Sequence, residues 1–144
     1  MKFKIIIDSC CHIPDAHIKG RANKGNAACG ILYIDESGNE YEDSRFLGEM
    51  TVPEAEFNGL IHALDNATNY TRGEVEVWMD SELVVKWMTG KYRMRKEHIK
   101  PLYDKAKTYE MRYKKVEYFH HPRSSTLAQR ADNLANKEFR KHIQ

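Results

Sequence analysis

The order of the apolar patterns along the chain constrains its fold more than any other feature. Strand-like apolar segments come first, at residues 2–8, 27–34 and 40–49. Helical spacing of apolar residues then alternates with two further strand-like segments. Helices are expected at 53–68, 81–90, 97–112 and 126–142, and strands at 74–80 and 115–120. A meander of strands followed by helix-linked strands predicts an α/β fold in which helices flank a mixed sheet.

The chain is expected to form one domain. Its 144 residues, of which 41% are hydrophobic, are enough for a sizeable core. No internal repeat, low-complexity tract or linker divides residues 1–144. The segment between the first two strands, residues 9–26, is predicted to be a long loop because it contains Pro14, Gly20 and Gly25.

Charge is unevenly distributed, although the formal net charge is only +2. Residues 35–56 hold eight acids and one base, whereas residues 86–115 hold eleven bases and three acids. The basic stretch fits a solvated helical face. It also fits a strip that binds phosphates, where basic side chains displace counterions. Met88, Tyr92 and Met94 interleave with these bases, which suits a surface that contacts sugars as well as phosphates.

The sequence carries no sign of export or of a membrane span. Its first residues turn acidic too early for a signal peptide. No apolar run is long enough to cross a membrane. The cysteines are Cys10, Cys11 and Cys29, an odd number with two adjacent, which makes a poor disulfide framework. We therefore expect a cytoplasmic protein in a reducing environment.

Four acidic residues are the strongest candidates for chemistry. Asp8 and Asp80 follow apolar strands, and parallel pairing of those strands would bring them to one edge of the sheet. Glu56 is expected in the first turn of its helix, and Asp132 lies among small alanines in the last helix. Each acid alone fits a cap or a surface charge. Together they predict an oxygen cage for Mg²⁺, and two such ions favour in-line displacement at phosphate.

A zinc site is the competing prediction near the start of the chain. The residues that could form it are Cys10, Cys11, His12, His17 and Cys29. Adjacent cysteines have the wrong spacing for a usual structural zinc clamp. Loop or buried thiols with solvent-facing histidines are therefore expected instead.

With these residues in place, the sequence resembles type 1 ribonuclease H. The matching stretches run in order over nearly the whole chain: IIID, KGNAACGIL, TVPEAEFNGLIHAL, EVEVWMDSELVVKWMTGKY, KPLYDKA, VEYFHHPR and ADNLANKEF. The resemblance implies a ribonuclease H-like five-stranded mixed sheet of order 3-2-1-4-5. It also implies an endonuclease that uses two Mg²⁺ ions, or Mn²⁺, to hydrolyse the RNA strand of an RNA/DNA hybrid, leaving 5′-phosphate and 3′-hydroxyl ends.

The same resemblance assigns roles to residues. Asp8 would bridge both metals, and Glu56, Asp80 and Asp132 would complete the cage. His120 would assist proton movement near the leaving group, with His121 as its rival. Gly25 and Asn26 match a turn that approaches the duplex. The full set expected to bind nucleic acid is Gly25, Asn26, Thr51, Ser81, Lys91, Arg93, Arg95 and Lys96.

Several departures from the family pattern bear on substrate choice. Val52 and Pro53 replace two asparagines that read the minor groove of the hybrid, and Glu82 replaces a glutamine. These changes remove neutral hydrogen-bonding groups and add a negative charge. An insertion around HIPDAHIKGRA separates Asp8 from Gly25. The basic protrusion of some members is absent, and residues 91–100 are a partial substitute.

Two other functions stay open on the sequence alone. The first is a module of the same fold that binds hybrids or structured RNA without cutting, although the complete set of four acids favours cleavage. The second is a related nuclease acting on branched or duplex DNA, which the Val52-Pro53 change allows. The resemblance favours a monomer.

Overall fold

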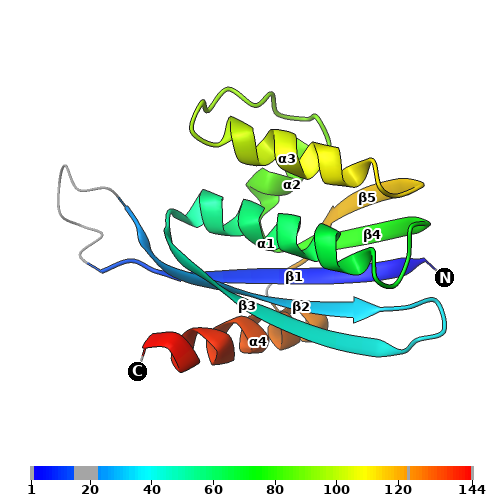
Figure 1. Ribbon diagram of the computed structural model, residues 1–144, viewed down its shortest axis with the longest axis horizontal. Coiled ribbons are helices and arrows are strands. Elements are labelled where there is room, and N and C mark those ends of the chain that lie inside the picture. Colours follow the sequence, from blue (N-terminus) through cyan, green and yellow to red (C-terminus); the bar gives the residue numbers. More distant parts are fainter. Residues whose placement is uncertain (1, 15–22, 123, 144) are drawn as a thin grey trace.

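The computed structural model describes residues 2–14, 23–122 and 124–143. These residues form a five-stranded sheet and four helices (Figure 1). Along the chain the elements are β1 Phe3–His12, β2 Gly25–Ile34, β3 Glu40–Met50, α1 Val52–Ala67, β4 Glu74–Met79, α2 Glu82–Met88, α3 Lys100–Glu110, β5 Lys115–His120 and α4 Thr126–Ile143.

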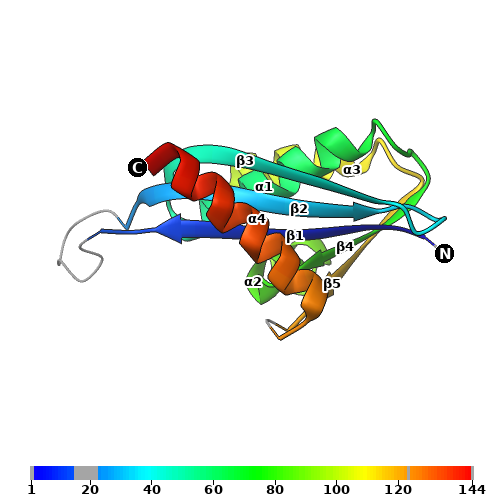
Figure 2. The ribbon, with the colours of Figure 1, turned by 90° about the horizontal axis from the view of Figure 1, so that it is seen from below.

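The strands lie in the order β3-β2-β1-β4-β5, which confirms the predicted mixed sheet. β1, β2 and β3 form an antiparallel meander, and β4 and β5 run parallel to β1. α1, α2 and α3 cover one face of the sheet (Figure 1). α4 crosses the opposite face over β1, β2 and β3 (Figure 2).

The main core lies between the sheet and the layer of three helices. Alternation in β1 sends Ile5 and Ile7 to this face and Ile6 to the face of α4. Phe57, Leu60 and Leu64 share one stripe of α1 and are fully buried against it. Burying one such side chain contributes about 1.5–3 kcal/mol. The core under α4 is smaller, and its buried residues include Ile6, Leu32 and Ala131.

The first two strands are longer than predicted, and the loop between them is correspondingly shorter. β1 continues to His12 and β2 begins at Gly25, so residues 9–12 and 25–26 are strand and not loop. The prediction failed because backbone pairing, seen at His12 with Asn26, continues the hairpin where the apolar alternation has stopped. Residues 15–22, with His17 and most of the predicted insertion, lie outside the described residues.

Three helices begin at residues other than those predicted. α2 begins one residue later, at Glu82, with Ser81 as its N-cap. α1 begins one residue earlier, after a capping box in which the Thr51 hydroxyl accepts from Glu54 N–H while the Glu54 carboxylate accepts from Thr51 N–H. α3 begins at Lys100 and not at 97. A helix from 97 would place Pro101 where a backbone N–H should bond to an earlier carbonyl, and proline has none.

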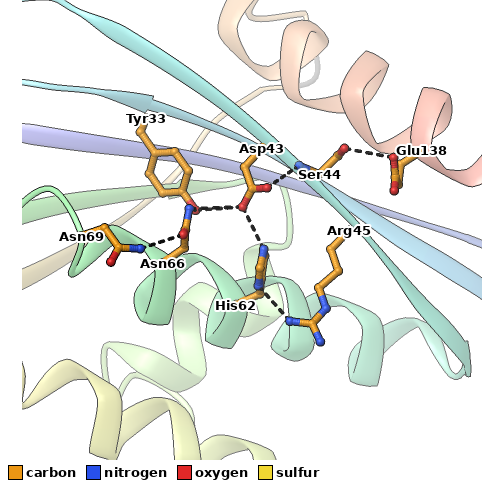
Figure 3. A network of polar contacts seen from close by, with 8 residues as sticks. All are labelled: Tyr33, Asp43, Ser44, Arg45, His62, Asn66, Asn69 and Glu138. Carbon is orange, nitrogen blue, oxygen red and sulfur yellow. Dashed lines mark hydrogen bonds and ion pairs between the residues drawn. The ribbon is translucent and has the colours of Figure 1, made fainter.

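A polar network ties β3 to the helices on both sides of the sheet (Figure 3). Asp43 accepts from His62 Nε2 at 2.8 Å and from Asn66 Nδ2 at 3.3 Å. Its neighbour Ser44 donates through Oγ to Glu138 of α4 at 3.2 Å. Because adjacent strand residues point to opposite faces, these two contacts fix α1 and α4 to the same stretch of β3.

Candidate active site

The strand register brings Asp8 and Asp80 together, as predicted. β1 and β4 pair in parallel, with Ile7 opposite Met79, and the next residue on each chain is the aspartate. The prediction that Asp8 ends its strand is wrong, because β1 continues past Asp8 and stays paired with β2. Asp80 does follow the last residue of β4. Both side chains line one cavity of about 240 Å³.

α4 supplies the third carboxylate of this cavity. Asp132 lies on α4 and lines the cavity together with Asp8 and Asp80. Its carboxyl group shares a hydrogen bond with that of Asp8, which requires a proton between them. Asn136, one turn further along the helix, donates to Asp132 Oδ1 at 3.0 Å and fixes its orientation. Asn136 was not predicted, although its helical spacing from Asp132 is visible in the sequence.

Glu56 lies beside these three groups but further inside. It is 8% exposed, on the second turn of α1 and not on the first, because the helix begins at Val52. It does not line the cavity of the three aspartates. Its negative charge nevertheless contributes to raising the pKa of Asp8, so the two carboxylates are close enough to interact.

Asp8 carries the clearest electrostatic signature of the site. Burial raises its pKa, and the charge of Asp80, the hydrogen bond with Asp132 and the charge of Glu56 raise it further, to about 9. A divalent cation would remove this repulsion. Oxygen-only donors suit a hard ion such as Mg²⁺, so the residues present fit that metal. Within the described ranges, however, no group of three or more His, Cys, Asp or Glu side chains is already arranged to hold an ion.

The two histidines at the end of β5 lie in different surroundings. His120 is exposed, and its Nε2 lies 3.1 Å from the backbone oxygen of Asp80, to which it donates. His121 is 3% exposed and lines a different cavity with Ile6 and Trp78. Burial lowers the pKa of His121, which favours its neutral form. Only His120 therefore faces solvent at the rim of the carboxylate cluster.

Two of the residues expected to approach nucleic acid are not in a turn. Gly25 and Asn26 are the first residues of β2. Gly25 is needed there for close packing, because a Cβ at this position would lie 2.0 Å from the backbone oxygen of His12. The prediction of a turn was wrong because the β1–β2 hairpin continues to Asn26, which also made the predicted loop too long.

The remaining predicted contacts lie at helix starts and in one loop. Thr51 caps α1, and Ser81 caps α2 by accepting from Val84 N–H at 3.3 Å. The loop between α2 and α3 carries four exposed basic residues, which are Lys91, Arg93, Arg95 and Lys96. Three further residues that line the carboxylate cavity were not predicted as site residues: Ser9, Ala128 and Gln129. Gln129 could have been found from its spacing of three residues to Asp132.

The departures from the family pattern have clear structural settings. Val52 is 44% exposed at the first position of α1, beside the capping box. Glu82 does not present an isolated negative charge, because Lys86 Nζ lies 2.8 Å from its carboxylate. Lys86 also donates to the hydroxyl of Tyr92 at 3.3 Å. The charge added by Glu82 is thus offset within α2, at a spacing of four residues that the sequence already shows.

Among the residues that the structure describes, which exclude His17, the thiols near the start of the chain are not arranged as a zinc site. All three cysteines are free, and those of β1 point to opposite faces because they are adjacent in a strand. Cys11 Sγ donates to the backbone oxygen of Met50 at 3.3 Å. Burial raises the pKa of Cys10 to about 11 and that of Cys29 to about 12, so both stay protonated. The ring of His12 stacks on Phe139 at 3.9 Å.

Comparison with known proteins identifies the family. Residues 15–138 match the family model described as reverse transcriptase-like. A bifunctional protein of Mycobacterium tuberculosis is 33% identical over 118 residues, which is 81% of this chain and 32% of that protein. Ribonuclease HI of Halobacterium salinarum is 30% identical over 81% of this chain and 58% of its own. The chain thus spans from about a third to somewhat over half of these relatives.

Solved structures agree over the full length. LC11-RNase H1, solved in complex with an RNA/DNA hybrid, has a TM-score of 0.84 and 32% identity, covering 99% of this chain and 100% of that one. RNase H1 from Halobacterium salinarum has a TM-score of 0.82 and 25% identity, with 98% and 99% covered. By its family model, its fold and its similarity to LC11-RNase H1, this chain belongs to the type 1 ribonuclease H family.

Proposed function

We propose that this protein is an endoribonuclease that hydrolyses the RNA strand of RNA/DNA hybrids, leaving 5′-phosphate and 3′-hydroxyl ends. The observation that carries the proposal is the crowding of Asp8, Asp80 and Asp132 around one cavity, where burial and then the neighbouring carboxylates raise the pKa of Asp8 to about 9. Such crowding is unfavourable without a cation and is typical of a functional site. A hybrid bound to LC11-RNase H1 supports the choice of substrate.

Two Mg²⁺ ions, with Mn²⁺ as a substitute, are the proposed cofactors, held by Asp8, Glu56, Asp80 and Asp132. When bound, such ions activate water and stabilise the charge on the leaving oxygen. Asp8 would give up its proton as it becomes a ligand, since coordinating carboxylates are ionised. His120, exposed beside Asp80, would take up or supply a proton near the leaving 3′-oxygen.

The proposed nucleic-acid surface extends from the carboxylates along the loop between α2 and α3. The exposed Lys91, Arg93, Arg95 and Lys96 would neutralise phosphates. Gly25, Asn26, Thr51 and Ser81 would contact the backbone of the duplex at the start of β2, α1 and α2. The 2′-hydroxyl and the A-form-like shape would distinguish RNA from DNA.

We further propose that residues 1–144 act as one catalytic domain and as a monomer in the cytoplasm. Free cysteines fit a reducing compartment. Among the helices of the described residues, none combines the length and the apolar character needed to cross a membrane.

The test is a panel of end-labelled substrates: an RNA/DNA hybrid, duplex RNA, duplex DNA and a four-way junction, each with Mg²⁺, Mn²⁺ or EDTA. We expect cutting of the hybrid's RNA strand with either metal and none with EDTA. Hybrid binding without cutting would identify a binding module instead. Preferential cutting of duplex or branched DNA would favour the related nuclease that exposed Val52 leaves open.

A further inference from the structure

Helix α4 rests directly on a glycine of the central sheet. Gly30 of β2 is paired with Asp8 of β1, so it lies beside the centre of the carboxylate cluster. A Cβ at Gly30 would lie 2.2 Å from the backbone oxygen of Ala131 and 2.5 Å from the backbone nitrogen of Ala135. Both atoms belong to the backbone of α4, so neither can rotate away. Figure 2 shows α4 crossing β2 on this face.

The same turn of α4 carries Asp132. Ala131, which makes the closest approach to Gly30, is the residue before it. The separation between α4 and the sheet at Gly30 therefore sets how far the Asp132 side chain must extend to reach Asp8. Ala131 and Ala135 are fully buried, and the third group near a Cβ at Gly30 is the Cβ of Leu134, at 2.7 Å, which is fixed to the helix backbone and cannot rotate away.

We infer that Gly30 is a positioning residue: it seats α4 so that Asp132 reaches the same cation as Asp8. The inference rests on the proposed function, because it concerns the metal site. Ordinary contact begins near 3.4 Å, so a methyl group at Gly30 has to push α4 away by roughly 1 Å. A shift of this size is large for a cation ligand, whose distances are tightly restricted.

The opposite face of the same strands is packed differently, which makes the role of Gly30 specific. Gly59 of α1 faces Ser9 and Cys29, and a Cβ there would lie 2.6 Å from Ser9 Oγ and 3.3 Å from Cys29 Cβ. These nearest atoms are side-chain atoms, and the Ser9 hydroxyl can rotate. α1 is thus not held to the sheet by a backbone contact of the kind seen at Gly30.

The experiment measures Mn²⁺ binding to the metal-depleted protein by titration calorimetry, with free Mn²⁺ followed by electron paramagnetic resonance. For Gly30→Ala we expect Mn²⁺ affinity to fall by about 10–100-fold, the range found when groups that orient ligands are changed. Gly73→Ala is the matched control, because its Cβ would make only an ordinary contact of 3.4 Å with Thr71. Leu64→Ala controls for lost stability, since Leu64 is buried on the other face.

A rescue variant separates positioning from general destabilisation. Asp132→Glu adds one methylene to the side chain, which offsets a retreat of α4 by roughly 1 Å. We expect Asp132→Glu to weaken Mn²⁺ binding in the wild-type background but to strengthen it by about threefold or more in the Gly30→Ala background. If Gly30→Ala fails to fold, Ala135→Ser adds a smaller group to the same interface. We then expect Ala135→Ser to weaken Mn²⁺ binding and Asp132→Glu to restore part of it.

The outcomes distinguish this inference from the proposal on which it rests. If the wild-type protein does not bind Mn²⁺, the proposed metal site is wrong. If the wild type binds Mn²⁺ and folded Gly30→Ala binds it equally well, the site stands and the positioning role of Gly30 is wrong. Equal losses in Gly30→Ala and Leu64→Ala, with no rescue by Asp132→Glu, would also overturn the positioning role.

Discussion

His62 donates a hydrogen bond from Nε2 to Asp43 at 2.8 Å and so joins α1 to the edge strand β3 (Figure 3). The proton is assigned to Nε2 because Arg45, which can only donate, lies 3.2 Å from Nδ1. Burial opposes the charge of Asp43, but hydrogen bonds from His62 and Ser44 outweigh it and lower the pKa of Asp43. The network thus stabilises the ionised form of this carboxylate.

This network predicts a specific loss of stability in acid. The pKa of Asp43 is lower in the folded state than its ordinary value of 3.8, so its contribution is present above that value and disappears as the pH falls through the folded pKa. His62→Ala should lower the free energy of unfolding by about 1–3 kcal/mol at pH 7. Urea unfolding at pH 7 and pH 3 measures this, and the difference between wild type and variant should shrink at pH 3. An equal difference at both pH values would contradict the role of the ionised Asp43.

Asp8 predicts the opposite dependence on pH in the metal-free protein. Its pKa is raised from 3.8 to about 9 on folding, so the folded state holds a proton that the unfolded state loses, and stability falls as the pH rises between these values. Asp8→Asn removes this titration and should stabilise the metal-free protein at neutral pH by about 2–4 kcal/mol. Urea unfolding in EDTA at pH 5, 7 and 8.5 measures the slope.

Two comparisons make the Asp8 prediction specific. Asp104→Asn changes an exposed carboxylate paired with Lys100 on α3, and it should keep the wild-type slope. Adding Mg²⁺ to the wild type should flatten the slope, because cation binding replaces the proton on Asp8. An unchanged slope in Asp8→Asn would mean that another group holds the extra proton.

In cleavage assays Asp8→Asn and Asp80→Asn should both lose metal-dependent activity while still binding hybrid, and cutting by Asp80→Asn would refute the site.

The parts of the site that depend on strand pairing could be predicted from the sequence. The parts that depend on the distance between α4 and the sheet could not. Asp8 and Asp80 could be brought together from alternation and parallel pairing, because both depend on local pattern. The extension of β1 to His12 could not, because its last residues have no apolar alternation. Nor could the contact between Gly30 and the backbone of Ala131, since it depends on the distance between α4 and the sheet.

The basic loop between α2 and α3 predicts a salt-dependent contribution to hybrid binding. Arg93→Ala and Arg95→Ala should each weaken binding at low salt and reduce the slope of log affinity against log salt by about 1 if the side chain contacts a phosphate. Fluorescence anisotropy of a labelled hybrid with the Asp80→Asn protein, between 50 and 200 mM KCl, measures both effects. Lys137→Ala removes an exposed charge from α4 and should leave the slope unchanged. Slopes that stay at the wild-type value in both arginine variants would identify the loop as an ordinary solvated surface.

Replacing each of the two adjacent histidines with alanine should have a different effect. His120 is exposed and bonded to the Asp80 carbonyl, so His120→Ala should lower kcat by about 10²-fold with little change in thermal stability. His121 is 3% exposed and packs beside Ile6 and Trp78, so His121→Ala leaves a cavity and should cost about 2–4 kcal/mol of stability. Single-turnover cleavage of a hybrid and thermal unfolding separate the two effects. A large loss of kcat in a stably folded His121→Ala or His121→Asn, with normal activity in His120→Ala, would transfer the proton-moving role to His121.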